Sequence, residues 1–292
     1  MKEKDITQKV LADHNDIFAD IVNVLLFDGK ELVKPEDLIT IGPVSDYRSM
    51  DGKIHEMERD VAKDWSKENV RFSILGIEHQ SKPEANMPAR ILAYDGASYR
   101  SQLLESKDQK VSPVVTIVLY FGTDRHWDKP KSLIKSMEDF PKALSDFVCD
   151  YKINVFEIAW LPDETIAKFK SDFKVVAEFF SSIRKGTDIV LSDKTKITHV
   201  DEIIKLLSAA TGDPGYEETL AWTKQTGKEI HTMCDLYQRV KNEGLAEGRA
   251  EGRAEGGVNM LIDLVNKKLL AVKDAAEQLN ISEEAFIKLM QQ

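Results

Sequence analysis

An apolar run of eight residues, Val114–Phe121, constrains the fold of this chain more than any other feature of its sequence. Most of its members are β-branched or aromatic. Such a continuous run predicts a central strand that is buried on both faces. The chain has 292 residues, of which 42% are hydrophobic, so it can bury a sizeable core and is neither disordered throughout nor collagen-like.

Further helices and strands are predicted on both sides of this run. The order up to the run is helix, three strands, helix, strand, and helical spacing dominates the chain beyond Asp163. The pattern at 54–65 is weak, and a helix is the alternative there. A hairpin-type turn is expected at Ser49–Gly52 because Asp-Gly tolerates positive φ. The predicted elements are helices near 15–28, from Met87, and near 163–184, 199–210 and 215–242, with strands at 38–41, 54–65, 70–79, 114–121 and 153–160.

A repeat of period four occupies residues 243–257, where Glu-Gly recurs at every fourth position. Because each Gly costs about 1 kcal/mol in a helix relative to Ala, we expect a weak solvated helix or a flexible connector. The repeat therefore divides the chain into a main domain (1–242), a linker (243–257) and a small helical hairpin (258–292).

The C-terminal hairpin has the spacing of a helix-turn-helix at 275–290. Its second helix carries Lys288 as its only basic residue, so packing or self-association is favoured over DNA reading. A homo-oligomer formed through the C-terminal helices is therefore expected.

The charge balance is acidic, with 40 Lys and Arg against 50 Asp and Glu and a net charge of −10. This balance argues against a protein that coats nucleic acid, since phosphate binding depends on Lys and Arg. It does not exclude a local phosphate site, because residues 61–130 are close to neutral. Any affinity for DNA should be modest and salt-dependent.

Cysteine content and hydropathy bear on the compartment. Cys149 and Cys234 are too few for an all-cysteine zinc site or a disulfide framework. The N-terminal residues contain no apolar signal-peptide core, and nowhere do about 18 apolar residues follow one another. We therefore expect a cytoplasmic protein with reduced thiols that does not associate with membranes.

The residues that could carry chemistry begin at the end of the predicted strand 70–79, with Glu78-His79-Gln80. Side chains two apart on a strand share a face, so Glu78 and Gln80 should point together and His79 away. A carboxylate and an amide are costly to bury without partners, and loops at strand ends often carry sites. On an exposed edge strand the same triplet would be unremarkable.

A second carboxylate, Asp60, lies on the preceding segment. If 54–65 is a strand paired with 70–79, Asp60 can lie across from Glu78. Two carboxylates and a backbone carbonyl such as that of His79 form a hard-oxygen set suited to Mg²⁺ or Mn²⁺. The alternative for Asp60 is an ordinary ion pair with Arg59 or Lys63.

Three more residues are candidates on neighbouring helices. Arg90 and Tyr94 are four residues apart and so share a helix face, where they could contact phosphate. Alternatively, Tyr94 packs on the sheet with Arg90 beside it. Asp20 on the first helix either faces solvent, the favoured alternative, or reaches the site as an additional acid.

Other chemistries lack sequence support. The serine-hydrolase, P-loop, dinucleotide-binding and zincin motifs are absent from the sequence. Five of the six histidines, all except His79, show no metal-ligand spacing with one another or with the cysteines. They are His14, His55, His126, His199 and His231.

The run GIEHQSKPEANMPARILAYDGASYRSQL (76–103) resembles the recombination-promoting nuclease (Rpn) and transposase family of the PD-(D/E)xK nuclease superfamily. The segments NDIFADIVN (15–23) and VVTIVLYFGTDRHWDKPKSL (114–133) are similar to this family as well, as are the surroundings of Asp60 and the Glu-Gly-Arg-Ala repeat. The resemblance covers roughly 15–140.

The resemblance implies an α/β fold with a restriction-endonuclease-like α-β-β-β-α-β core, here with a helical C-terminal extension. It implies a Mg²⁺- or Mn²⁺-dependent DNA endonuclease linked to recombination or transposition. Asp60 and Glu78 would hold the metal, and Arg90 and Tyr94 match helix positions of the family. Gln80 stands where the superfamily motif usually has Lys.

The presence of Gln80 in place of the usual Lys leaves two functions open. Gln can orient a water molecule but carries no charge for the transition state, although Lys82 could compensate if the strand continued. The protein is therefore expected to be either an endonuclease or a catalytically degenerate copy of a nuclease fold that acts in binding or assembly.

Overall fold

The computed structural model describes residues 2–41, 45–48, 54–57, 60–67, 70–105, 110–187, 196–227 and 230–291. By their contacts these residues form two compact units, Met1–Cys234 and Asp235–Gln292. No helix in the described part of the chain is both long and apolar enough to cross a membrane.

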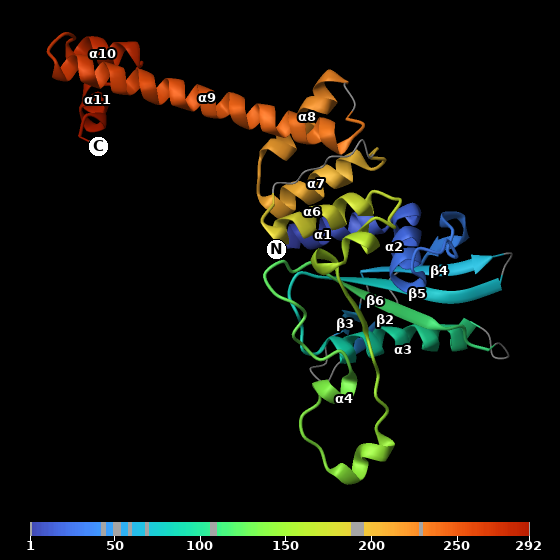
Figure 1. The fold of residues 1–292 in the computed structure, drawn as a ribbon. Coiled ribbons are helices and arrows are strands. Elements are labelled where there is room, and N and C mark those ends of the chain that lie inside the picture. Colours follow the sequence, from blue (N-terminus) through green and yellow to red (C-terminus); the bar gives the residue numbers. More distant parts are fainter. Residues whose placement is uncertain are drawn as a thin grey trace. The chain divides into compact units, whose positions relative to one another are not determined.

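A mixed five-stranded sheet in the order β1-β4-β5-β6-β7 forms the centre of the first unit (Figure 1). Neighbours among β1, β4 and β5 are antiparallel, whereas β6 pairs in parallel with both β5 and β7. Strands β5 and β6 can be parallel because a helix, α3 (Met87–Glu105), carries the chain back between them. The strands are β1 (Leu38–Thr40), β4 (Val61–Lys67), β5 (Val70–Gln80), β6 (Val114–Tyr120) and β7 (Asn154–Glu157), and β2 (Ser45–Arg48) and β3 (Ile54–Met57) form a separate antiparallel pair.

Helices cover both faces of this sheet (Figure 1). On one face lie α1 (Lys2–Ala12), α2 (Asn15–Phe27) and α6 (Phe173–Lys185), and on the other lies α3 (Met87–Glu105). The fold of this unit is therefore mixed α/β. The remaining helices of the unit are α4 (Leu133–Ser136), α5 (Asp163–Ile166), α7 (Val200–Thr211) and α8 (Gly215–Thr226), with 3₁₀ helices at η1 (Pro35–Asp37), η2 (Lys142–Phe147) and η3 (Ile158–Trp160).

The apolar run forms β6 and is buried on both faces, as its composition predicts. On one face, Val118 and Tyr120 pack with Met87 and Ile91 of α3 in one core cluster. On the other face, the ring centroid of Phe121 lies 5.0 Å from that of Phe180 in α6. A continuous apolar run is required here because both faces meet helices.

Several predicted segments differ from the structure. The predicted helix near 163–184 is divided into α5 and α6, and the predicted helix near 215–242 is divided into α8 and the start of α9 (Met233–Asn266). The segment 54–65 is neither one strand nor a helix, because β3 ends at Met57 and β4 begins at Val61. Helix α1, which the sequence analysis did not predict, precedes α2. The predicted turn Ser49–Gly52 lies outside the described residues.

The second unit contains most of α9 (Met233–Asn266), followed by α10 (Val272–Gln278) and α11 (Glu283–Leu289). The repeat 243–257 lies within α9, so its backbone is helical, and the predicted divisions at 242 and 257 both fall inside this helix. The unit has a core cluster of its own, formed by Leu261, Ala275, Ala276 and Phe286. Self-association through these helices stays a prediction.

Helix α11 begins with a side-chain cap whose removal should destabilise this unit slightly. Ser282 Oγ accepts a hydrogen bond from the backbone N–H of Ala285 at 3.2 Å. Ser282→Ala should therefore cost about 1 kcal/mol, whereas Ser282→Asp keeps an acceptor and should cost less. Hydrogen exchange of the α11 amides measures the difference, and equal exchange in both variants would mean that the cap contributes nothing.

Candidate functional site

Two acidic residues from adjacent strands meet at one end of the sheet. Asp60 directly precedes β4, and the pairing of Val61 with Ile77 places it beside Glu78 near the end of β5. Glu78 Oε1 accepts a hydrogen bond from the backbone N–H of Asp60 at 3.1 Å, and Asp60 Oδ2 accepts one from the N–H of His79 at 2.8 Å. Each carboxylate is thus fixed by the other strand, and the predicted adjacency of Asp60 and Glu78 is found.

Both carboxylates are buried, and each is paired with a cation. The side chain of Glu78 is 0% exposed and that of Asp60 is 8% exposed. Arg90 Nη2 lies 2.9 Å from Glu78 Oε2, and Lys9 Nζ lies 2.6 Å from Asp60 Oδ1. Unpaired charges are costly to bury, so these two cations balance a pair of carboxylates that solvent reaches poorly.

Arg90 joins Glu78 to the first turns of α3. Its Nε donates to the Tyr94 hydroxyl group at 2.8 Å, and its Nη1 donates to Glu84 Oε2 at 3.1 Å. Burial lowers the pKa of Arg90, but the charge of Glu78 and the bond to Tyr94 outweigh it and raise the pKa overall. Burial and Glu78 also raise the pKa of Tyr94. At neutral pH, Arg90 is therefore a cation and Tyr94 a neutral hydroxyl group.

His79 points to the opposite face from Glu78, as strand alternation predicts. Its ring stacks on Phe121 with centroids 5.9 Å apart, and its Nδ1 lies 3.6 Å from Asp60 Oδ2. Burial raises the pKa of Asp60, but the imidazole of His79, the ammonium group of Lys9 and the N–H of His79 outweigh it and lower the pKa from 3.8 to about 2. Asp60 is therefore ionised well below neutral pH.

The lowered pKa of Asp60 predicts a pH-dependent contribution to stability. Because the folded value lies below the unfolded one, the contribution is full above pH 3.8 and is lost as the pH falls toward 2. Asp60→Asn should reduce the free energy of unfolding by on the order of 2 kcal/mol at neutral pH. Urea unfolding of both proteins between neutral pH and pH 2 measures the gap, which should close at the acid end. A gap that stays constant would contradict the assignment.

Of the remaining predicted residues, Gln80 and Lys82 lie at the end of β5, whereas Asp20 lies elsewhere. Gln80 is the last residue of β5 and is half-buried, and its backbone carbonyl accepts from the N–H of Phe121 at 2.8 Å. Lys82 is exposed in the bend after the strand, so β5 does not continue to it. Asp20 Oδ2 instead accepts from Ser171 N and Ser171 Oγ, both at 2.7 Å. Asp20 thus fixes the turn before α6, where it neither faces open solvent nor contacts Asp60 in the described hydrogen bonds.

Sequence reasoning missed Lys9, which brings a lysine to the carboxylates from α1 and not from β5. The alternative partner Lys63 is engaged elsewhere, since its Nζ donates to Asp13 O and Thr40 Oγ1, both at 2.7 Å. Arg59 lies outside the described residues. No local pattern marks Lys9, because its partner lies some fifty residues away in the chain.

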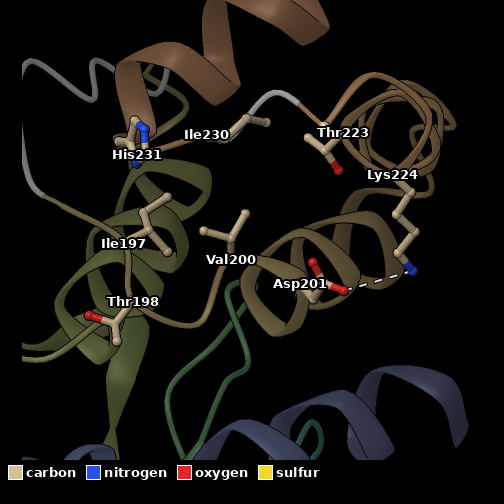
Figure 2. A pocket seen from close by; sticks show the side chains of 9 residues that line it. Ile197, Thr198, Val200, Asp201, Thr223, Lys224, Ile230 and His231 are labelled. Carbon is tan, nitrogen blue, oxygen red and sulfur yellow. Dashed lines mark ion pairs between the residues drawn. The ribbon is translucent and has the colours of Figure 1, made fainter.

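A pocket of about 480 Å³ lies apart from these residues, beside α7 and α8 (Figure 2). Apolar side chains of Ile197, Val200 and Ile230 line it, and the pair of Asp201 and Lys224 at 3.8 Å spans part of its wall. None of the predicted site residues lines this pocket.

The fold and the paired charges define a mixed α/β protein with two buried carboxylates and two cations at one end of its sheet. Residues 66–208, just under half of the chain, match the model of the family described as "Putative transposase, YhgA-like". This span includes Glu78, Gln80, Arg90 and Tyr94 but begins after Asp60. No curated protein and no solved structure matches the chain.

Proposed function

We propose that this protein is a Mg²⁺- or Mn²⁺-dependent endonuclease that hydrolyses phosphodiester bonds in DNA. The observation that carries the proposal is the pair Asp60 and Glu78, whose backbones lie side by side at one end of the sheet and whose side chains are each paired with a cation. The match to a family of transposase-like proteins supports DNA as the substrate and a role in transposition. A role in recombination rests on the sequence resemblance alone.

The order of elements also supports this proposal. Helix α2, the antiparallel strands β1, β4 and β5, helix α3 and the parallel strand β6 follow one another. This is the α-β-β-β-α-β order of a restriction-endonuclease-like core, with the pair β2 and β3 inserted. The order therefore supports our proposal of that fold and, with the sequence resemblance, of a place in the Rpn branch of the PD-(D/E)xK nucleases.

The donor set fits the proposed metal in charge and chemistry. Mg²⁺ and Mn²⁺ favour carboxylate oxygens, and Asp60 and Glu78 offer four of them. Lys9 and Arg90 balance these two negative charges, so a bound ion would have to displace their ammonium and guanidinium groups from the carboxylate oxygens. When bound, the ion would polarise a phosphoryl oxygen and lower the pKa of a coordinated water.

The surrounding side chains have separate tasks in this proposal. Arg90, which stays charged, binds a phosphoryl oxygen of the scissile group, and Tyr94 donates a hydrogen bond beside it. Gln80 orients the attacking water through its amide. Lys9 supplies from α1 the positive charge that Gln80 lacks on β5.

Nicking of supercoiled plasmid DNA tests the proposal. The wild type should cut in Mg²⁺ and stop in EDTA, and Asp60→Asn should be slower by at least about 100-fold. Asp163→Asn is the matched control, since Asp163 is an exposed acid that pairs only with Lys185 among its described salt bridges. Equal rates for wild type and Asp60→Asn, or full activity in EDTA, would overturn the assignment.

A second function is favoured by one specific observation. Lys9 and Arg90 already neutralise both carboxylates, so the pair is stable without a metal. The same two ion pairs are expected in a degenerate nuclease fold that acts in binding or assembly. Metal-independent binding of DNA in a gel-shift assay, together with no cleavage by any variant, is the result that this alternative predicts.

A further inference from the structure

A group of metal-ligating side chains lies where two helices begin in the first unit. His14 is the N-cap residue of α2, His199 is the N-cap residue of α7, and Glu202 lies in the first turn of α7. The histidines are 185 positions apart, which is why their sequence spacing shows nothing, and the fold brings them together.

The three side chains are close enough to share one ion. One ligand atom from each of His14, His199 and Glu202 lies within 4.8 Å of the other two, and all three residues are half-buried. The imidazole centroids are 3.8 Å apart, and His14 Nε2 lies 3.7 Å from Glu202 Oε1. A tetrahedral zinc ion with bonds of about 2.0 Å holds its ligands roughly 3.3 Å apart, so small rotations of the side chains would close the site.

Other carboxylates hold one of the two histidines in place. Asp16 Oδ2 lies 3.0 Å from His199 Nε2, and the buried carboxylate of Asp172 accepts from the backbone N–H of His199 at 2.6 Å. A carboxylate on a ligating histidine commonly fixes the orientation of its ring. The position of His199 is therefore set before any ion binds.

The charges around the histidines select a cation over an anion. Two helix N-termini and two imidazoles alone would suit an anion such as phosphate. Here, however, Asp16, Asp172 and Glu202 lie against the same histidines, and three carboxylates repel an anion. The same carboxylates offset the positive ends of the two helices.

We propose that His14, His199 and Glu202 form a zinc site that fastens the start of α2 to the start of α7. Two imidazoles with a carboxylate are typical ligands of Zn²⁺, whereas Mg²⁺ favours oxygen ligands alone. This site is therefore chemically distinct from Asp60 and Glu78 and does not rest on the proposed nuclease activity. Bound zinc stabilises the folded protein because the unfolded chain holds these ligands far apart.

Metal binding by the full-length, EDTA-treated protein tests the zinc site. Calorimetry should show one Zn²⁺ bound per chain, and Co²⁺ should give the visible absorption of a tetrahedral site. Zn²⁺ should also raise the midpoint of thermal unfolding. His14→Asn and His199→Asn should each weaken binding by at least about 10-fold and abolish the rise.

Two control variants separate the outcomes. His126→Asn removes a histidine that, like His14, faces a carboxylate, but His126 and Glu157 form a pair without a second imidazole among the described contacts. This variant, and Asp60→Asn, should bind Zn²⁺ like the wild type. No Zn²⁺ binding by the wild type, or undiminished binding by both His14→Asn and His199→Asn, would overturn the proposal. Loss of Zn²⁺ binding in Asp60→Asn alone would also overturn the proposal, because the zinc would then lie at the carboxylate pair.

Discussion

Replacing Glu78 by glutamine should slow metal-dependent cleavage of DNA by at least about 100-fold while the protein stays folded. Glutamine keeps the size of the side chain and an oxygen that can accept from the N–H of Asp60. It removes the negative charge that the proposed metal needs. Because position 78 becomes neutral, the rate of DNA cleavage should fall while the overall structure stays unchanged.

Glu84 provides the matched control for this experiment. Its Oε2 also accepts from Arg90, at 3.1 Å, but its side chain is 41% exposed and pairs with the other end of the guanidinium group. Glu84→Gln should keep at least most of the activity in the same plasmid assay. Similar rates for Glu78→Gln and the wild type would show that Glu78 is a structural partner of Arg90 and no metal ligand.

Replacing Arg90 by alanine should lower the free energy of unfolding of the first unit by about 3 kcal/mol. The reason is that Glu78, which is 0% exposed, would keep a buried charge without its cation. The value lies at the lower end for such pairs because the Arg90 side chain is itself about one third exposed. Urea unfolding followed by tryptophan fluorescence measures it, since all four tryptophans lie within Met1–Cys234.

A double variant separates the loss of charge balance from the loss of packing. In Glu78→Gln/Arg90→Ala the buried group is neutral, so much of the stability lost in Arg90→Ala should return. If the double variant is as unstable as Arg90→Ala, the cost comes from lost packing against Tyr94 and Glu84. If Arg90→Ala is as stable as the wild type, Glu78 does not carry a buried charge.

Much of the sheet and the core of the site could be predicted from local sequence. The run Val114–Phe121 predicts a strand with helices packed on both faces, because apolar side chains point to both sides of the sheet. Alternation along β5 predicts that Glu78 and His79 point to opposite faces. The adjacency of Asp60 to Glu78 follows from antiparallel pairing across a short connection, and Arg90 and Tyr94 from helical spacing.

The remaining features depend on contacts between distant parts of the chain. Lys9 reaches Asp60 across about fifty positions, and Asp20 bonds to Ser171 across about 150 positions. His14 and His199 meet only after α7 packs near the N-terminal helices. Hydrophobic periodicity reports which face of an element is buried but not which element covers it, so these partners could not be predicted.

Binding of Mn²⁺ shows whether Asp60 and Glu78 form a metal centre. The measurement is calorimetry in the His14→Asn/His199→Asn background, which removes the proposed zinc site, with and without Asp60→Asn and Glu78→Gln. We expect one Mn²⁺ per chain in the background protein and none after both acids are replaced. Equal Mn²⁺ binding in the two proteins, or none in either, would contradict a metal centre at Asp60 and Glu78.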